Sequence, residues 1–448
     1  MGGAPGESCV RSAGGLSARL ALRLYGFLCW ALIPALRWRL RRRARAEPVY
    51  GQHVDERFGY YASEVLQSLR QGSGPRVWVH AVSLGETWAA GLLLTALRDA
   101  MPGVRVVLTH GTATGRAAGA ALLRPGDVQL WQPWDTPGAV RRFLDACAPQ
   151  MGLLIETEVW PNMVACCVQA GMPLYLVNAR LSDVSLRAYQ RAPWLSGPAF
   201  AALAGVWAQT DADAARLRAL GAPVRGVAGN FKFDARPDAK QVEQGRALRA
   251  ALHKPVVMLA SSREGEESQW LQALQALRAD VPDCHWLLVP RHPQRFDGVA
   301  DLLRSAGLSF ARRSQHSALL DWVADPAEVW LGDSLGEMAL YYSLADVALL
   351  GGSFAPLGGQ NLIEAAACGC TVVMGPHTFN FSEVAERAVA AGAAVRAADM
   401  AQAIAAVAKL LDSDARQRHA RAQDFAAGYG GAVARTVAAL MALQPRLT

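Results

Sequence analysis

The sequence lacks the two glycine signatures that mark the commonest nucleotide-binding enzymes. No GxGxxG follows the first strand-like run, and no GxxxxGK[ST] occurs in the 448 residues. The first motif would hold a dinucleotide at the start of a Rossmann unit, and the second would cradle the phosphates of a nucleoside triphosphate. Their absence argues against a dinucleotide-dependent oxidoreductase and against a P-loop NTPase.

Metal-ligand spacing is missing as well. The eight Cys include no CxxC pair, and no His lies at zinc-ligand spacing from a Cys pair. Asp211 and Asp213 form an acidic DxD, but their place at the start of a helical pattern favours helix capping. We therefore expect reduced, buried thiols, no metal site and no cofactor.

The chain after residue 50 also lacks a net positive charge. Residues 1–50 hold nine Arg and two Glu, which accounts for the whole net charge of +7. The rest of the chain is neutral, whereas a nucleic-acid-binding domain carries a basic face, so we expect no nucleic-acid partner. Hydrophobic residues make up 52% and charged residues 19%, which is typical of a folded chain.

No apolar run reaches the roughly 20 residues that a spanning helix needs. Residues 24–36, LYGFLCWALIPAL, carry no charge, and a cluster of arginines follows them. Aromatic side chains suit a headgroup boundary, and arginines suit anionic lipid. A helix in the cytoplasmic leaflet, a short signal anchor and a core helix of the first domain all remain open. In the first two cases the rest of the chain stays cytoplasmic.

From residue 76, short β-rich runs alternate with helical periodicities, which is the signature of parallel βαβ units. The alternation pauses over the polar residues 230–254 and then restarts. We predict an α/β protein with two doubly wound Rossmann-like domains that face a cleft, and ligands beyond the carboxyl ends of the strands. The expected divisions are a membrane-associating helix and basic cluster at 1–46, a domain at 47–235 and a domain at 236–448. The expected strands are 76–82, 104–110, 151–156, 173–179 and 206–209, then 255–262, 285–291, 328–333, 346–352 and 370–375.

Polar motifs follow the strands of the first half. HAVSLGE places Glu86 in the first turn of a helix, as a helix-terminal charge or as a general base. ETEVWPNM places Glu156 and Glu158 at a strand end, where they are either site carboxylates or solvated loop charges. NARLS (178–182) follows the next strand, and GNFKFD places Lys232 at the start of the polar stretch.

The second half repeats this arrangement. Arg291 and His292 end a strand, and both can donate to a phosphate. GDSLGEM (332–338) is a glycine-punctuated turn. GGSFAPLGGQNLIEAAACG (351–369) predicts a loop entering a helix near Gln360 or Asn361, with free N–H groups suited to an anion. Glu364 lies in the first turn of that helix, as a ribose ligand or as a cap.

These motifs, with SSREGEE (261–267), VPRHPQRF (289–296) and GPHTFNF (375–381), resemble those of 3-deoxy-D-manno-octulosonic acid (Kdo) transferases and stand in the same order. The resemblance implies a GT-B fold, with the acceptor in the N-terminal domain and the CMP-sugar in the C-terminal one. It implies transfer of Kdo from CMP-Kdo to a lipid A precursor, on the cytoplasmic side of the bacterial inner membrane and in contact with its lipids.

The resemblance also assigns roles to residues. Glu86 corresponds to the general base of an inverting transfer, and Glu156 and Lys232 correspond to residues that stabilise the transition state. No metal is implied, because a helix N-terminus and an arginine can neutralise a leaving monophosphate. The positions that would hold CMP are Arg291, His292, Leu335, Gly336, Glu337, Asn361, Leu362, Ile363 and Glu364.

Two rival functions stay open at this point. One is another GT-B transferase that places a UDP-sugar on a lipid acceptor, which would bind UDP in preference to CMP. The other is a non-catalytic, membrane-bound sensor of sugar nucleotides, which would bind the nucleotide without turnover.

Overall fold

The chain divides into two compact units. The computed structural model describes residues 16–277 and 283–443. The first unit comprises Met1–Asp234 and Gly431–Thr448, and the second comprises Ala235–Gly430. The expected first domain ends at residue 235, and the second unit begins at Ala235; the expected second domain extends to residue 448, whereas the second unit ends at Gly430. Residues 1–15 and 444–448 of the expected domains lie outside the described residues.

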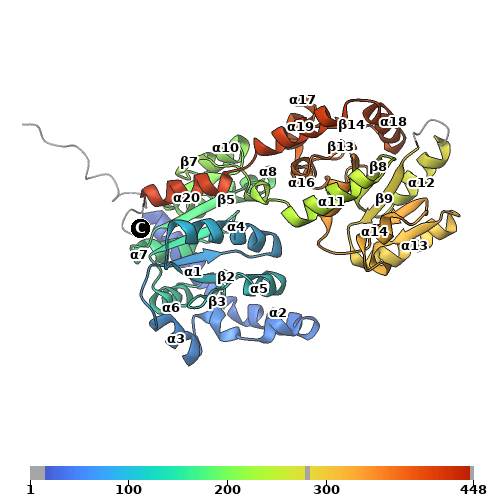
Figure 1. The fold of residues 1–448 in the computed structure, drawn as a ribbon. Coiled ribbons are helices and arrows are strands. Elements are labelled where there is room, and N and C mark those ends of the chain that lie inside the picture. Colours follow the sequence, from blue (N-terminus) through green and yellow to red (C-terminus); the bar gives the residue numbers. More distant parts are fainter. Residues whose placement is uncertain (1–15, 278–282, 444–448) are drawn as a thin grey trace, which may run out of the picture. The chain divides into compact units, whose positions relative to one another are not determined.

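The first unit contains a parallel sheet of seven strands in the order β3-β2-β1-β4-β5-β6-β7. Every residue of β2, β4 and β5 is buried, because helices cover both faces of the sheet (Figure 1). Such strands are continuous apolar runs in the sequence. The strands are β1 Arg76–His80, β2 Arg105–His110, β3 Val128–Trp131, β4 Met151–Ile155, β5 Leu174–Ala179, β6 Gly205–Ala208 and β7 Val224–Val227.

Most helices of the first unit connect these strands in βαβ order. Short 3-10 turns flank them at η1 Pro48–Gly51, η2 Val54–Phe58 and η3 Phe231–Asp234. The α-helices are α1 Leu16–Ala31, α2 Ile33–Ala46, α3 Ser63–Arg70, α4 Leu84–Ala100, α5 Ala113–Ala120, α6 Pro137–Cys147, α7 Pro161–Gln169, α8 Asp183–Gln190, α9 Pro193–Ala201, α10 Asp211–Ala219 and α20 Ala432–Leu443. Helices α4 to α10 are the ones that connect the strands, whereas α1, α2 and α3 precede β1 and α20 comes from the end of the chain.

The second unit repeats the architecture, with strand order β10-β11-β9-β8-β12-β13-β14. Its strands are β8 Val256–Ser262, β9 His285–Pro290, β10 Phe310–Arg312, β11 Val329–Leu331, β12 Val347–Leu350, β13 Thr371–Met374 and β14 Ala394–Arg396. Its helices are α11 Ala239–Ala251, α12 Glu266–Ala276, α13 Phe296–Ser305, α14 Leu319–Val323, α15 Met338–Leu344, α16 Leu362–Ala367, α17 Ser382–Ala390, α18 Met400–Leu411 and α19 Ala415–Ala427, with 3-10 turns η4 Pro293–Arg295 and η5 Arg313–Gln315. The two doubly wound α/β domains that the sequence predicts are confirmed.

Each sheet has one point where the chain reverses its direction of winding. In the first sheet this point lies between β1 and β4, and in the second it lies between β8 and β12. The loops that leave such a pair of strands diverge to opposite faces and open a crevice at their carboxyl ends, which is where doubly wound folds bind ligands. The loops after β1, β4, β8 and β12 are therefore the first places to look for a site.

The last helix returns to the first unit. α20 packs against α4, and Figure 1 shows the two lying side by side. Asp234, at the end of η3, accepts hydrogen bonds from the backbone N–H of Ala432 at 3.1 Å and of Val433 at 2.6 Å. A carboxylate satisfies the free N–H groups of a helix start and complements its dipole. This contact joins residues nearly 200 positions apart in the sequence.

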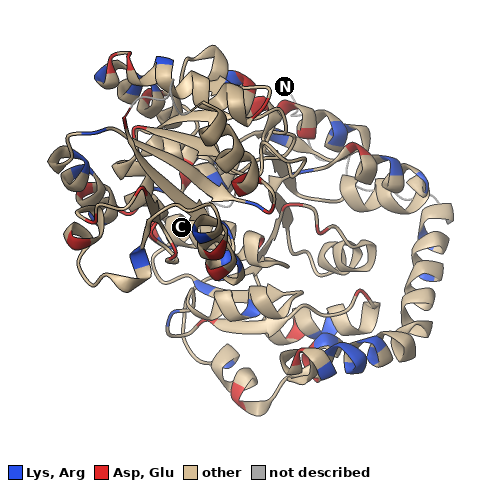
Figure 2. Ribbon diagram, turned by 90° about the vertical axis from the view of Figure 1, so that its right-hand side faces the viewer, with Lys and Arg blue, Asp and Glu red and all other residues tan. Residues whose placement is uncertain are grey.

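The N-terminal helices α1 and α2 are bent by 46° relative to each other. One face of α1 packs on α7 and α9, where Tyr25 hydrogen-bonds Asp135. Partial burial raises the pKa of Asp135 to about 6. The opposite face exposes large apolar side chains, and α2 carries six Arg in 14 residues, which Figure 2 shows as a cluster of blue positions. The exposed apolar residues are Leu20, Leu24, Phe27, Leu28, Trp30 and Leu32.

Length and composition single out two helical stretches in the described part of the chain. Ala415–Leu443 is long and apolar enough to cross a membrane, and so is the bent pair of Ser17–Ala31 and Ile33–Ala46 if it is taken as one span. The first stretch comprises α19 and α20, which belong to different units.

Candidate active site

Glu86 lies at the switch point of the first sheet, in the first turn of α4. Ser83 caps this helix, and its hydroxyl donates to Oε1 of Glu86 at 2.8 Å. The N–H of Val82 donates to Oε2 of Glu86 at 2.8 Å. The Ser83 hydroxyl also accepts the N–H of Glu86 at 3.4 Å. This reciprocal pairing of Ser and Glu three residues apart is close to a capping box, with the N–H of Val82 in place of that of the capping residue. The carboxylate is thus held rigidly, and each of its oxygens keeps a lone pair with which to accept a further proton.

Glu156 follows β4 on the other side of the switch point, and its oxygen Oε1 lies 3.5 Å from Nζ of Lys232. The φ angle of Glu156 is +68°, in the left-handed region that few side chains adopt. Backbone strain of this kind concentrates at functional sites. The left-handed turn directs a half-buried carboxylate toward the ammonium group, which comes from η3 more than 70 residues later.

Asn178, at the end of β5, fixes the backbone next to Lys232. It also has a positive φ, +50°, and is fully buried. Its Oδ1 accepts the N–H of Phe231 at 3.0 Å, and the side chain of Phe231 is itself fully buried. Asp234 holds the far end of the same turn through α20. The turn that carries Lys232 is therefore held at both ends. This gives Asn178, the first residue of the NARLS motif, a structural role.

The carboxylates at this switch point influence one another. Burial raises the pKa of Glu86, the hydrogen bonds from Val82 and Ser83 lower it, and the charges of Glu156 and Glu158 raise it again. A buried carboxylate with a raised pKa is a better proton acceptor. Nζ of Lys232 lies 3.5 Å from Oε1 of Glu156, and 3.6 Å from the point where a Cβ on Gly85, the neighbour of Glu86, would be. Its positive charge offsets part of this negative charge. The structure therefore brings together Glu86, Glu156 and Lys232.

The second switch point is built around a buried carboxylate that the sequence reasoning did not single out. Glu266 begins α12 and is fully buried. Its Oε1 accepts the N–H of Phe354 at 3.1 Å and of Ala355 at 3.2 Å, and its Oε2 accepts the N–H of Gly352 at 2.8 Å. Oε2 also accepts the N–H of Arg263 at 2.8 Å. One side chain thus fixes the glycine-rich loop after β12.

The N–H groups at the beginning of the glycine-rich loop are not free for an anion, because Glu266 accepts those of Gly352, Phe354 and Ala355. The anion site expected where the loop enters the next helix concerns other N–H groups and stays a prediction. The loop also approaches the end of β8 very closely, since a Cβ on Gly351 would lie 2.4 Å from the carbonyl oxygen of Ser261. The adjacent carboxylates in SSREGEE were the sequence signal that could have indicated these hydrogen bonds of Glu266.

Asn361 and the residues after it begin α16, which starts at Leu362, close to the expected position. Oδ1 of Asn361 accepts the N–H of Ile363 at 3.0 Å. The side chains of Leu362 and Ile363 are buried, so only their backbone can face a ligand. Burial raises the pKa of Glu364, and the charge of Arg291 lowers it, which places these two groups within electrostatic reach of each other.

The remaining predicted residues lie in the loops of the same unit. Burial and the neighbouring arginines, including Arg291, lower the pKa of His292. Leu335 is largely exposed, and Gly336 has φ +80° and accepts a hydrogen bond from Nε2 of Gln241 at 2.8 Å. Glu337 accepts a hydrogen bond from Arg313 at 3.1 Å. Arg313 and Gln241 therefore hold this turn in place.

No group of three or more His, Cys, Asp or Glu that could hold a metal lies among residues 16–277 and 283–443. Asp213 in the DxD motif accepts the N–H of Leu181 at 2.9 Å and pairs with Arg216 at 3.0 Å. The Asp213 carboxylate therefore links the segment after β5 to the first turn of α10.

Solved structures share the fold. The UDP-GlcNAc 2-epimerase from Neisseria meningitidis aligns with a TM-score of 0.55 and 16% identity, over 82% of this chain and 99% of that one. A glycosyltransferase from Rickettsia africae aligns with a TM-score of 0.54 and 11% identity, over 82% of this chain and 98% of that one. At such identities the likeness concerns the fold alone, and it confirms the GT-B architecture of two Rossmann-like domains.

Sequence relatives define the family. Residues 52–235 match the family described as 3-deoxy-D-manno-octulosonic-acid transferase (kdotransferase). The 3-deoxy-D-manno-octulosonic acid transferase of Bordetella pertussis is 47% identical over 94% of this chain and 97% of its own length. That of Haemophilus influenzae is 33% identical over 75% of this chain and 78% of its own length. The chain therefore belongs to the 3-deoxy-D-manno-octulosonic acid transferase family, and it is a glycosyltransferase enzyme.

Proposed function

We propose that this enzyme transfers Kdo from CMP-Kdo to a lipid A precursor with inversion at the anomeric carbon. The observation that carries the proposal is the group of Glu86, Glu156 and Lys232 at the first switch point, in a chain of this family. A carboxylate with a raised pKa beside a fixed cation suits the removal of a proton from a sugar hydroxyl.

In this mechanism Glu86 takes the proton of the acceptor hydroxyl as its oxygen bonds to the anomeric carbon of Kdo. The bond from that carbon to the phosphate oxygen breaks, and CMP leaves with the electron pair. One displacement on the face opposite the leaving group inverts the configuration. Lys232 and Glu156 stabilise the charge that develops in the transition state.

The second unit is proposed to hold CMP. Arg291 and His292 would contact the phosphate, and Glu364 would accept hydrogen bonds from the ribose. Leu335, Gly336 and Glu337 form a turn that would contribute to the same site. Asn361, Leu362 and Ile363 would contribute backbone and polar contacts, since the two aliphatic side chains are buried.

The test is a measurement of CMP release from CMP-Kdo with and without a tetra-acylated lipid A precursor, followed by the mass of the lipid product. The expected result is lipid-dependent release and a mass gain of whole Kdo units, with the anomeric configuration of the product inverted by NMR. A protein that melts at higher temperature with UDP but not with CMP would contradict the proposal. CMP binding without any turnover would favour the sensor.

We also propose that α1 and α2 hold the enzyme at the cytoplasmic face of the inner membrane. The exposed apolar face of α1 would enter the leaflet, and the arginines of α2 would contact anionic headgroups. α1 also packs on α7 and α9, so its removal would expose the apolar side chains beneath it. Substitutions on its outer face are therefore a cleaner test than truncation.

Replacing Phe27 and Trp30 together with Asp is expected to lower binding to anionic vesicles by at least about 10-fold. Burial of each ring contributes on the order of 1.5–3 kcal/mol, and about 1.4 kcal/mol is a factor of 10. Both rings are more than half exposed, so the melting temperature should stay unchanged. Leu320→Asp is the matched control, because it removes a side chain of similar exposure from the second unit. Equal vesicle sedimentation of all three proteins would contradict the anchor.

A further inference from the structure

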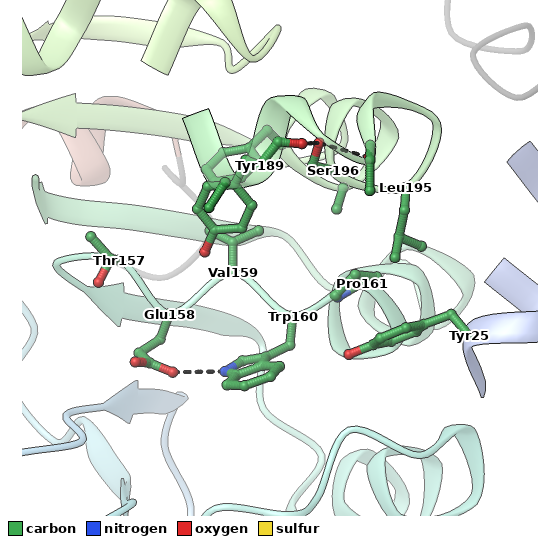
Figure 3. A pocket seen from close by; sticks show the side chains of 13 residues that line it. Tyr25, Thr157, Glu158, Val159, Trp160, Pro161, Tyr189, Leu195 and Ser196 are labelled. Atoms are coloured by element: carbon green, nitrogen blue, oxygen red, sulfur yellow. Dashed lines mark hydrogen bonds between the residues drawn. The ribbon is translucent and has the colours of Figure 1, made fainter. Parts of the chain in front are cut away.

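A hollow of about 280 Å³ lies beside the first switch point, between α1, α8, α9 and the loop from β4 to α7. Figure 3 shows Tyr25, Pro161 and Leu195 on one side of it and Thr157, Glu158 and Tyr189 on the other. Its deeper wall is apolar and includes Val159, Ala199 and Phe200. Tyr25 is held in this wall through its hydrogen bond to Asp135.

A second hollow, of about 360 Å³, lies along α1. Pro161, Leu195 and Ala199 line both hollows, so the two lie next to each other between α1, α7 and α9, and together they are called the groove. Leu22 of α1 and Val168 of α7 wall the second part. The groove therefore runs beneath the helix whose opposite face exposes a row of large apolar side chains.

The inner end of the groove adjoins the catalytic carboxylates. Thr157 and Glu158 line it and directly follow Glu156 in the sequence. Burial raises the pKa of Glu158, whose Oε2 accepts a hydrogen bond from Nε1 of Trp160 at 2.7 Å. The charge of Glu158 also influences Glu86. Polar groups are thus concentrated at the end beside the reacting residues, and apolar side chains dominate the part that leads to α1.

We propose that this groove binds an acyl chain of the acceptor lipid, while the sugar lies at the Glu158 end. The inference rests on the proposed function and adds to it a binding site for the hydrocarbon part of the substrate. A molecule with a polar head and a hydrocarbon tail matches this gradient from carboxylate to apolar wall.

The length of the acyl chain should therefore control the use of the acceptor. Burial of one CH₂ group is worth about a fourfold change in affinity. In a series of glucosamine disaccharide phosphates with acyl chains shortened stepwise, kcat/KM is expected to fall at each step by up to this factor. The KM for CMP-Kdo should stay constant across the series.

Two substitutions of one residue test the groove itself. Leu195 lines both hollows, so Leu195→Trp narrows both of them, and we expect it to raise the KM for long-chain acceptors at least about 10-fold. Its kcat, and its KM for CMP-Kdo, should remain as in the unaltered enzyme. Leu195→Ala widens the groove and should shift the preference toward longer chains. Gly197→Trp is the control on the same helix, because a Cβ there would meet no atom within 4 Å.

Each outcome has a defined meaning. If the unaltered enzyme transfers Kdo and Leu195→Trp behaves as Gly197→Trp at every chain length, the acyl site is refuted. If Leu195→Trp weakens binding to phosphatidylglycerol vesicles but leaves the acceptor KM in detergent micelles unchanged, the groove belongs to bilayer lipid and the proposal is again overturned. If the unaltered enzyme binds CMP and transfers Kdo to no acceptor, the proposed function fails first. Should Leu195→Trp lower the melting temperature, Ala188→Trp on the exposed rim replaces it.

Discussion

Glu86→Gln is expected to lower kcat by about 10²-fold or more while leaving the affinity for CMP unchanged. The amide has the shape of the carboxylate but cannot take the proton of the acceptor hydroxyl. Its oxygen can still accept from Val82 or Ser83, so α4 keeps most of its cap. The measurement is steady-state transfer to the lipid acceptor, combined with CMP titration of the same protein.

Ser83→Ala separates the two tasks of this carboxylate. It removes the capping hydroxyl and should destabilise the enzyme by about 0.5–2 kcal/mol, with turnover reduced only a few-fold. If Glu86 served only as a cap, both variants would lose stability and neither would lose its chemistry. Near-normal turnover by Glu86→Gln would therefore remove Glu86 from the mechanism.

The pH profile gives a further check on the same residue. A general base acts as the charged carboxylate, so the rate falls as the pH drops through its pKa. Burial, and the charges of Glu156 and Glu158, raise the pKa of Glu86 above its ordinary value of 4.5. The acid limb of kcat/KM is therefore expected above pH 4.5 and should be absent from the residual activity of Glu86→Gln.

The fold follows from the sequence because its central strands are buried on both faces. The ten expected strands are all present, and the four that were missed, β3, β7, β10 and β14, are the edges of the two sheets. Edge strands are short and partly exposed, and VRGV in β7 alternates between half-buried and exposed positions. Such a segment has no apolar run, so no periodicity distinguishes it from a loop. The polar stretch 230–254, where the sequence showed only a pause in the alternation, also contains a helix, α11.

The place of the candidate site was predictable from the sequence, but its detail was not. Polar residues at strand ends locate Glu86, Glu156 and Arg291, because parallel strands direct their carboxyl ends to one edge of each sheet. Lys232 was located only by its motif at the start of the polar stretch. The left-handed conformations of Glu156 and Asn178 leave no trace in the sequence. Glu266 was missed because its four partners are backbone groups, which carry no residue identity.

Glu266→Gln is expected to weaken binding of CMP-Kdo, although the hydrogen bonds of this side chain go to backbone N–H groups of the protein. The carboxylate accepts from four N–H groups, whereas an amide offers one acceptor oxygen and turns an NH₂ group toward the other donors. Each buried N–H left without an acceptor costs about 1–3 kcal/mol, so the loss of two destabilises the second unit by about 2–6 kcal/mol. The loop after β12 would then shift, and with it the start of α16.

The expected kinetic result is a KM for CMP-Kdo raised about 10-fold or more, with the KM for the acceptor lipid unchanged. Glu264→Gln is the matched control, because Glu264 lies two residues before Glu266 and is exposed. A purely structural role for Glu266 would lower the melting temperature and the amount of active enzyme but leave both KM values as they are. A selective rise in the KM for CMP-Kdo, measured on folded protein, would instead support a role of this buried carboxylate in positioning the donor loop, and with it the proposed CMP site at the second switch point.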